Sequence, residues 1–275
     1  MITFPNAKIN LGLNIVERRP DGYHNLETVF YPIMGLTDVL EIVPATTTRL
    51  HCYGRTVDCP EEKNLVMKAC RLMQREAGAP EVDMHLYKHI PDGAGLGGGS
   101  SDAAHAMLML NQMFGLGIGR ERLAQMAATL GADCPFFIYN KPVMATGIGD
   151  VFSPASVGLG GYTLLLVKPE VSVPTAVAYS RVSPQPSQSR LTQQLSLPVE
   201  QWQTAGVRNQ FEPSVFAAYP QLADIKSELA RSGALYASMS GSGSSIFGIF
   251  DNANLAEAAA RNFAGSLHFV MPLGL

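Results

Sequence analysis

The sequence is short of cysteine, tryptophan and charge. Its 275 residues include four cysteines and one tryptophan, and 16% of the residues are charged. No two cysteines form a C-x-x-C pair, which argues against a cysteine-based zinc site. Disulfides are not expected either, because the predicted compartment is reducing. The sequence therefore predicts no dedicated metal-ligating residues.

Long apolar runs and a strong net charge are also missing. No stretch of about 18 apolar residues occurs, so no transmembrane helix is predicted. The N-terminus lacks the basic region and apolar stretch of a signal peptide, which makes the cytoplasm the expected location. A net charge of −3 gives no electrostatic case for a nucleic-acid or membrane partner. We expect a globular monomer or weak homodimer.

Glycine, in contrast, is concentrated in one stretch. Residues 91–104 read Pro-Asp-Gly-Ala-Gly-Leu-Gly-Gly-Gly-Ser-Ser-Asp-Ala-Ala. Because glycine has no Cβ, successive backbone N–H groups can converge on an anion. A helical pattern begins near Ser100, and the free N–H groups of its first turn would add to the attraction. The stretch therefore predicts a phosphate-binding loop.

Three other readings of this loop are less consistent with the residues. The P-loop of nucleotide hydrolases needs a lysine after its last glycine, where this chain has Ser100. Gly93, Gly95 and Gly98 match the dinucleotide fingerprint G-x-G-x-x-G, but the acidic ribose-binding residue about 20 positions later is missing. A flexible linker is disfavoured because both flanks have the periodicity of regular structure.

An alternating strand pattern covers residues 6–16. Apolar side chains occupy one face, and Lys8 and Asn10 lie on the other. That polar face is compatible with an ordinary solvated surface or with a site. A Pro-Asp-Gly turn signal follows, and the resulting hairpin is predicted to bring Tyr23 and His24 near the strand.

Two later segments also carry polar groups in unusual settings. Asp133 follows a predicted helix end and is bounded by proline and two phenylalanines. It is either a turn residue that accepts local N–H groups or a functional acid. Residues 240–245 read Ser-Gly-Ser-Gly-Ser-Ser between two predicted strands, which alone indicates a hairpin.

Together these motifs resemble the GHMP kinases, a family of small-molecule kinases. The triple glycine and the Asp-Gly-Tyr-His element at residues 21–24 resemble the branch that acts on 4-diphosphocytidyl-2-C-methyl-D-erythritol. The resemblance implies an α+β, two-domain GHMP kinase fold. It places a ribosomal protein S5 domain 2-like N-terminal domain at residues 1–155 and an α/β sandwich C-terminal domain at residues 156–275. The implied activity is ATP-dependent phosphorylation of the substrate's 2-hydroxyl in the non-mevalonate isoprenoid route.

The resemblance also implies roles for individual residues. Lys8 and Asp133 would be catalytic. The expected ATP contacts are Asn64, Lys88, Pro91, Asp92, Gly93, Ala94, Gly95, Leu96, Gly97, Gly98, Gly99, Ser100 and Ser101. The expected substrate contacts are Asn10, Tyr23, His24, Thr175 and Tyr179, with the tyrosines stacked on cytosine and His24 reading its edge. Mg²⁺ would be held mainly by phosphates and water, with a hydroxyl from Ser100 or Ser101.

Three alternative functions follow from the same residues. A GHMP kinase for a smaller alcohol would not need the Asp-Gly-Tyr-His element. A nucleotide-binding regulator without catalysis would not need both Lys8 and Asp133. A dehydrogenase would need the absent ribose-binding acid.

Periodicity predicts the remaining elements. The expected helices are 61–77, 121–130, 221–231 and 253–264, and the expected strands are 82–87, 163–167, 234–240, 246–250 and 267–271. Residues 141–161 are rich in glycine and proline and are predicted to hold the domain boundary. Residues 181–201 are polar and poor in aromatics, and a mobile loop is expected there.

Overall fold

The structure is a computed structural model that describes residues 1–56, 59–180, 182–187 and 190–274. The chain forms two compact units. Unit 1 contains residues 1–7, 36–92 and 97–141, and unit 2 contains residues 8–35, 93–96 and 142–275. Within the described ranges, no helix combines the length and the apolar character needed to cross a bilayer.

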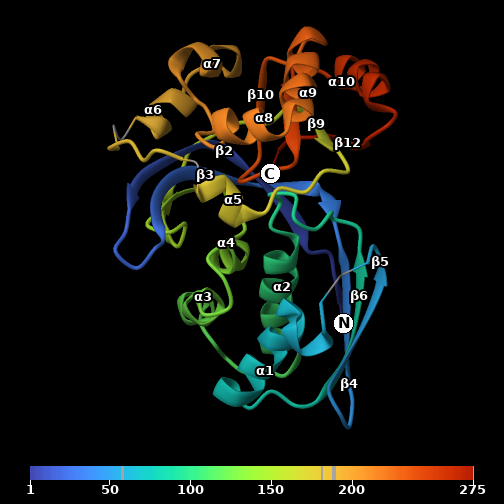
Figure 1. The fold of residues 1–275 in the computed structure, drawn as a ribbon. Helices are drawn as coiled ribbons and strands as arrows, with labels where there is room; N and C mark the ends of the chain where they lie inside the picture. The colour runs from blue at the N-terminus through green and yellow to red at the C-terminus, as the bar shows by residue number, and fades with distance from the viewer. Residues whose placement is uncertain (57–58, 181, 188–189, 275) are drawn as a thin grey trace. The chain divides into compact units, whose positions relative to one another are not determined.

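Unit 1 is built on a four-stranded sheet in the order β1-β4-β6-β5 (Figure 1). Its strands are β1 (Ile2–Thr3), β4 (Val39–Pro44), β5 (Arg49–Gly54) and β6 (Val82–Lys88). β6 runs antiparallel to β4 and parallel to β5. Alternate residues of β6 are buried, whereas Asp83, His85 and Tyr87 face the other side and are partly or well exposed. One face of the sheet is therefore covered and the other faces solvent.

The helices of unit 1 are α1 (Leu65–Ala77), α2 (Gly98–Met113), α3 (Arg120–Ala128) and α4 (Cys134–Tyr139), with a short 3₁₀ turn η1 (Glu61–Lys63) before α1. α1 and α2 contact strands β5 and β4 of the sheet, and α3 and α4 pack against α2. α1 begins later than the predicted residue 61, because Asn64 is extended and its Oδ1 accepts a hydrogen bond from Val66 N at 2.9 Å. Such an N-cap fixes where a helix starts.

Unit 2 contains two four-stranded sheets. The first has the order β2-β3-β7-β8 and the second the order β10-β11-β9-β12. The strands are β2 (Asn6–Arg18), β3 (His24–Thr37), β7 (Val143–Thr146), β8 (Val151–Pro154), β9 (Thr163–Lys168), β10 (Tyr236–Met239), β11 (Ile246–Phe250) and β12 (Leu267–Pro272). β9 and β11 are wholly apolar in their centres and lie inside the second sheet, between β10 and β12.

Helices of unit 2 pack against both of its sheets (Figure 1). They are α5 (Thr175–Ser180), α6 (Leu191–Leu195), η2 (Val199–Gln201), α7 (Trp202–Ala205), α8 (Glu212–Ala218), α9 (Pro220–Arg231), α10 (Ala253–Ala260) and η3 (Arg261–Phe263). The expectation of a structureless loop over residues 181–201 was wrong for its second half, where Leu191 and Leu195 are buried in α6. Residues 181, 188 and 189 of that segment lie outside the described residues.

The division into units differs from a single cut after residue 155. The chain passes from one unit to the other after residues 7, 35, 92, 96 and 141. β2 and β3 join unit 2 because they share a sheet with β7 and β8, which come more than a hundred residues later. The predicted boundary region, residues 141–161, contains the last of these crossings, after residue 141, and the rest of it holds the hairpin β7–β8 of unit 2.

Candidate active site

The first half of the glycine loop, residues 93–96, is held inside unit 2. Ser240 donates its hydroxyl to the carbonyl oxygen of Gly95 at 2.8 Å, and Ser245 N donates to Ala94 O at 3.3 Å. Gly95 has a φ of +75°, and a Cβ on it would lie 2.0 Å from Ser240 O. A side chain at this position is therefore excluded by backbone conformation and by space. The glycine-serine motif at residues 240–245 thus supports this half of the loop.

The second half of the loop starts α2 in unit 1. Gly97 is the N-cap residue, with a φ of +72°, and the helix follows at once. Ser100 is half-buried and its hydroxyl hydrogen-bonds the thiol of Cys134. Ser101 is fully buried, with its Oγ 3.4 Å from Nδ1 of His105. Ser100 is therefore the more accessible of the two hydroxyls predicted to meet Mg²⁺.

Lys88 lies in a buried ionic cluster of unit 1. Its Nζ is 2.7 Å from Oδ2 of Asp102 and also bonds Asp38, and all three side chains are at most 2% exposed. Burial lowers the pKa of Lys88, but the two carboxylates outweigh it and the net pKa is raised. Burial raises the pKa of Asp102 well above its usual value, despite the neighbouring ammonium.

This cluster fixes the start of α2. Asp102 lies in the second turn of the helix, and the ammonium of Lys88 is 3.3 Å from where a Cβ on Gly98 would stand. Asp38 accepts hydrogen bonds from the backbone N–H groups of His89 and Ile90, at 2.5 and 2.8 Å. The strand before the loop and the helix after it are thus tied to the same buried charges.

Lys8 is the central cation of the predicted site in unit 2. It is 3% exposed, donates from Nζ to Asn10 Oδ1 at 2.8 Å, and lies over the ring of Phe30 at 4.8 Å from its centroid. Its backbone N–H donates to Leu96 O at 2.9 Å, which joins β2 to the glycine loop. Lys8 therefore does not lie on an ordinary solvent-exposed strand face, which was the simpler interpretation of the sequence.

Asn10 is oriented by groups on both sides. Its Nδ2 donates to Thr28 Oγ1 at 3.0 Å, and Thr28 in turn bonds the carbonyl of Gly12 at 2.5 Å. The backbone N–H of Asn10 is 3.4 Å from Ser240 Oγ. With its amide nitrogen occupied by Thr28, the Oδ1 atom is left to face Lys8.

Asp133 is half-buried and immediately precedes α4 in unit 1. It has helical backbone angles, with φ of −81° and ψ of −17°, and its side chain makes no capping hydrogen bond to the helix. Asp133 is therefore not an N-cap residue of α4. Cys134 beside it is fully buried, and burial raises the pKa of its thiol to about 11.

The predicted cytosine-reading residues gather in unit 2. The rings of His24 and Tyr179 are 5.0 Å apart at 32°, and Tyr179 also meets Phe211 edge-on at 4.8 Å. Thr175 Oγ1 lies 3.2 Å from Ser242 Oγ of the glycine-serine motif. Burial, assisted by Arg18, lowers the pKa of His24, which favours the neutral imidazole.

Tyr23 follows the turn and is exposed, with 62% of its surface accessible. The turn itself is closed by Arg19 N donating to Tyr23 O at 2.8 Å, so the predicted hairpin is confirmed. Asn64 in unit 1 is buried, and its side chain caps α1 and lies 3.8 Å from Cys52 Sγ. Pro91 is buried, and Asp92 is exposed at the start of the loop.

Four supporting residues were not among the predicted site residues. Thr28 and Asn209 lie in unit 2, where Asn209 Nδ2 donates to the carbonyls of Met239 and Gly241 at 2.8 and 2.7 Å. Asp38 and Asp102 lie in unit 1. Asp102 is recognisable in the sequence as an acid three residues after the triple glycine, but nothing in the sequence pairs it with a lysine 14 positions earlier.

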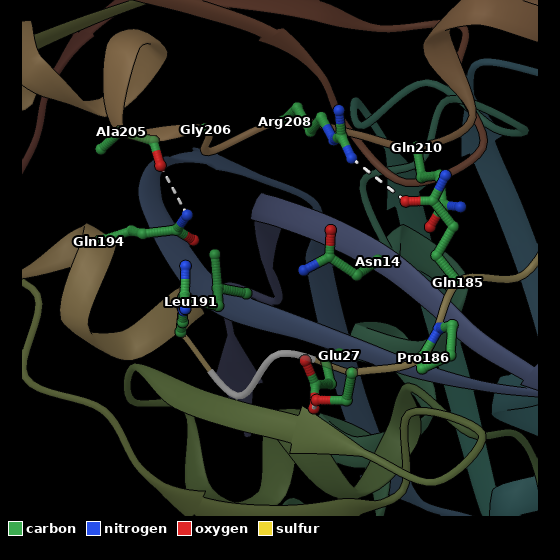
Figure 2. A pocket seen from close by; sticks show the side chains of 12 residues that line it. Asn14, Glu27, Gln185, Pro186, Leu191, Gln194, Ala205, Gly206, Arg208 and Gln210 are labelled. Atoms are coloured by element: carbon green, nitrogen blue, oxygen red, sulfur yellow. Dashed lines mark hydrogen bonds between the residues drawn. The ribbon is translucent and has the colours of Figure 1, made fainter.

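A pocket of about 280 Å³ in unit 2 was also not predicted (Figure 2). Its lining combines two arginines and one glutamate with several amides, and the charged members are Glu27, Arg190 and Arg208. Gln194 Nε2 donates to Ala205 O at 2.6 Å across one side, as the dashed line shows. None of the residues predicted for ATP or substrate is among those that line it.

The sequence of this chain is similar to known protein families. Residues 64–141 match the family model described as GHMP kinases N terminal domain, and residues 199–267 match GHMP kinases C terminal. A protein of Bacteroides fragilis named 4-diphosphocytidyl-2-C-methyl-D-erythritol kinase is 54% identical over 254 residues, covering 91% of this chain and 92% of that one. A Porphyromonas gingivalis protein of the same name is 47% identical, covering 94% and 96%.

A solved structure agrees with these sequence matches. The crystal structure of 4-(cytidine 5'-diphospho)-2C-methyl-D-erythritol kinase aligns over the whole length of both chains, with a TM-score of 0.80 and 32% identity.

Proposed function

The chain belongs to the 4-diphosphocytidyl-2-C-methyl-D-erythritol kinases of the GHMP kinase family, and from this premise we propose how its residues divide the work. The enzyme transfers a phosphoryl group from ATP to the 2-hydroxyl of its cytidine-linked substrate, in the non-mevalonate route to isoprenoid precursors. The observation that carries the assignment of roles is the buried ammonium of Lys8, hydrogen-bonded to Asn10 and joined through its backbone to the glycine loop.

Phosphoryl transfer needs positioning and charge stabilisation more than covalent help from the protein. Asp133 accepts the proton of the substrate's 2-hydroxyl as general base. Lys8 stabilises the developing negative charge on that oxygen and on the transferred group. The Asn10 oxygen holds the ammonium in one place, because an unpaired lysine of this length would sample many rotamers.

The loop from Pro91 to Ser101 holds the ATP phosphates with its backbone N–H groups. Gly95 supports this role because its docking on Ser240 leaves no space for a side chain. Mg²⁺, when bound to ATP, neutralises phosphate charge, and the half-buried hydroxyl of Ser100 is the loop group that fits it. Lys88 and Asn64 support the loop and α1 from within unit 1, since both are buried and already bonded.

Residues of unit 2 bind the cytidine half of the substrate. The ring of Tyr179 and the exposed ring of Tyr23 supply the aromatic faces, and His24 reads the base edge. Thr175 contributes a hydroxyl near the glycine-serine motif. A neutral His24 presents one donor and one acceptor nitrogen, which is the pattern needed to bond the edge of a cytosine.

Product analysis tests the proposal. Purified protein is incubated with ATP, Mg²⁺ and either the cytidine-linked diol, the same diol without cytidine, mevalonate or homoserine. We expect phosphorylation of the first compound alone, at its 2-hydroxyl, as read by ³¹P NMR. Transfer to a small alcohol instead would favour another GHMP kinase activity. Bound ATP without consumption of any acceptor would favour a regulator. The cytoplasmic location and the oligomeric state stay predictions.

A further inference from the structure

Two histidines lie side by side on the solvent face of the unit 1 sheet. β5 and β6 run parallel in a register that sets His51 opposite His85, and Asp83 is two residues before His85 on the same face. The imidazole rings are stacked, with centroids 4.9 Å apart and an angle of 18° between their planes. None of these residues has a part in the function proposed above.

The three side chains present ligand atoms to a common point. One nitrogen from each imidazole and one carboxylate oxygen all lie within 4.8 Å of one another. His51 Nε2 is 3.0 Å from Asp83 Oδ1, and His85 Nε2 is 3.8 Å from Asp83 Oδ2. Neighbouring ligands around a tetrahedral Zn²⁺ are separated by roughly 3.3 Å when each bond is about 2.0 Å long. Small rotations of these side chains therefore reach that geometry.

The carboxylate of Asp83 has an unusual environment. Its Oδ1 is buried, yet it accepts no hydrogen bond from any residue in the described parts of the chain. Nε2 of His51 lies 3.0 Å from this oxygen without a hydrogen bond between the two atoms. A buried polar atom without a partner costs free energy. A cation seated between the oxygen and the two nitrogens would remove that cost.

A further contact selects the ligating atom of His85. Tyr53 OH lies 3.1 Å from Nδ1 of this histidine. When Nδ1 carries the proton and donates it to the phenol oxygen, Nε2 is left with its lone pair directed toward Asp83. Metal-binding histidines commonly have their second nitrogen held in this way. Glu41, opposite His85 on β4, adds negative charge to the same face.

We propose that His51, Asp83 and His85 form a binding site for one divalent transition-metal ion of the zinc class. Two imidazoles and one carboxylate are a ligand set that suits Zn²⁺ and leaves a fourth position for water. Each of the three side chains is between 31% and 41% exposed, so an ion can enter from solvent. No local sequence pattern indicates this site, because the histidines are 34 positions apart and meet through the strand register.

The bound ion would join β5, the last strand of the sheet, to β6. β5 is attached along one side only, since the order of the sheet is β1-β4-β6-β5. A ligand that binds the folded state and not the unfolded chain stabilises the fold by mass action. The expected consequence is a higher melting temperature with metal present. The transfer reaction is not expected to depend on the site.

Calorimetric titration of the full-length, tag-free protein with ZnCl₂ at pH 7.5, after EDTA treatment and dialysis, tests the proposal. We expect one saturable Zn²⁺ per chain and a melting temperature raised by at least about 2 °C. His51→Ala and His85→Ala should each weaken binding at least tenfold, since each removes one of three ligands. Asp83→Asn, which keeps the side-chain size, provides the same test if an alanine variant folds poorly. Tyr53→Phe should weaken binding less than either histidine variant.

His268→Ala is the matched control, because His268 lies on β12 in unit 2 and its Nδ1 hydrogen-bonds the carbonyl of the nearby Ser266. This variant should bind Zn²⁺ with wild-type affinity. The proposal is overturned by an absence of saturable binding in the wild type. It is equally overturned by unchanged affinity in both His51→Ala and His85→Ala, or by an equal loss in His268→Ala, which would indicate scattered surface binding.

Discussion

Ser240 and Gly95 are bound to each other across 145 positions of sequence. The serine hydroxyl donates to the Gly95 carbonyl at 2.8 Å, while the serine carbonyl occupies the place where a Cβ on Gly95 would stand. The glycine-serine motif thus supports the glycine loop through backbone contacts that only glycine permits. The backbone N–H of Asn10 lies 3.4 Å from the same serine hydroxyl, so strand β2 shares this anchor.

Substitution of Gly95 by alanine should therefore displace the loop. We expect kcat/KM for ATP to fall by at least about 100-fold, the loss that a displacement of about 1 Å can produce. Gly160→Ala is the control, because a Cβ there meets nothing within 4 Å and no positive φ is recorded. Steady-state kinetics with varied ATP provide the measurement. Equal activity of the two variants would show that the loop tolerates a side chain and would contradict its proposed role.

Asp133→Asn tests the proposed general base. The amide keeps the shape of the side chain but cannot accept the proton, so kcat should fall by about 10²–10⁴-fold. ATP binding, measured by equilibrium titration, should remain near wild type. Asp251→Asn removes an exposed carboxylate in unit 2 and should leave kcat unchanged. A kcat for Asp133→Asn within tenfold of wild type would be inconsistent with proton transfer to this residue.

The reading of cytosine by His24 predicts a pH dependence. Burial lowers the pKa of His24 below its ordinary 6.5, so the ring is neutral at pH 7 and gains a proton only at more acidic pH. The protonated ring has no acceptor nitrogen. KM for the cytidine substrate should therefore be constant from pH 8 to 6.5 and rise below that range, while KM for ATP stays level.

His24→Ala is the matching variant. It should raise KM for the cytidine substrate and remove the additional rise at acidic pH, with little change for ATP. The measurement is a pair of KM–pH profiles for wild type and variant. An equal effect of the variant on the two substrates would contradict a role for His24 in base recognition.

The sequence predicted the longer helices and strands better than the short helices and the contacts between distant residues. The periodicity of apolar residues predicted β2, β6, β9 and α9. Each of these elements buries apolar side chains at a regular spacing or along its whole length. The glycine loop was recognisable because so many glycines are costly in ordinary structure. α4 and α8 were not predicted, since each is one to two turns long and contains proline in its first turn. Such short helices have too few residues to show a period.

In the candidate site, too, local sequence patterns predicted close neighbours but not contacts between distant residues. Lys8 and Asn10 are two positions apart on one strand, so alternation alone puts them on the same face. The charges around Lys88 come from Asp38 and Asp102, which are 50 and 14 positions away. Their convergence depends on the packing of β4, β6 and α2, which no local pattern encodes. For this reason Lys88 was predicted to contact ATP and not expected to be enclosed by carboxylates.

The enclosed cluster leads to a stability prediction. Lys88→Met removes the only cation bonded to Asp38 and Asp102 among the described residues, and both carboxylates stay buried. Loss of one partner from a buried ionic group costs about 3–5 kcal/mol of unfolding free energy. Urea denaturation followed by circular dichroism measures this change. Arg19→Met breaks an exposed pair with Asp21 and should leave the midpoint nearly unchanged.

The double variant Lys88→Met/Asp102→Asn separates lost charge balance from lost packing. If unpaired negative charge is the cause, the asparagine removes part of it and restores stability relative to Lys88→Met alone. Burial already raises the pKa of Asp102 well above normal, which means that the folded state favours a neutral group at this position. A double variant less stable than Lys88→Met would instead show that the Asp102 side chain stabilises the start of α2 independently of the lysine.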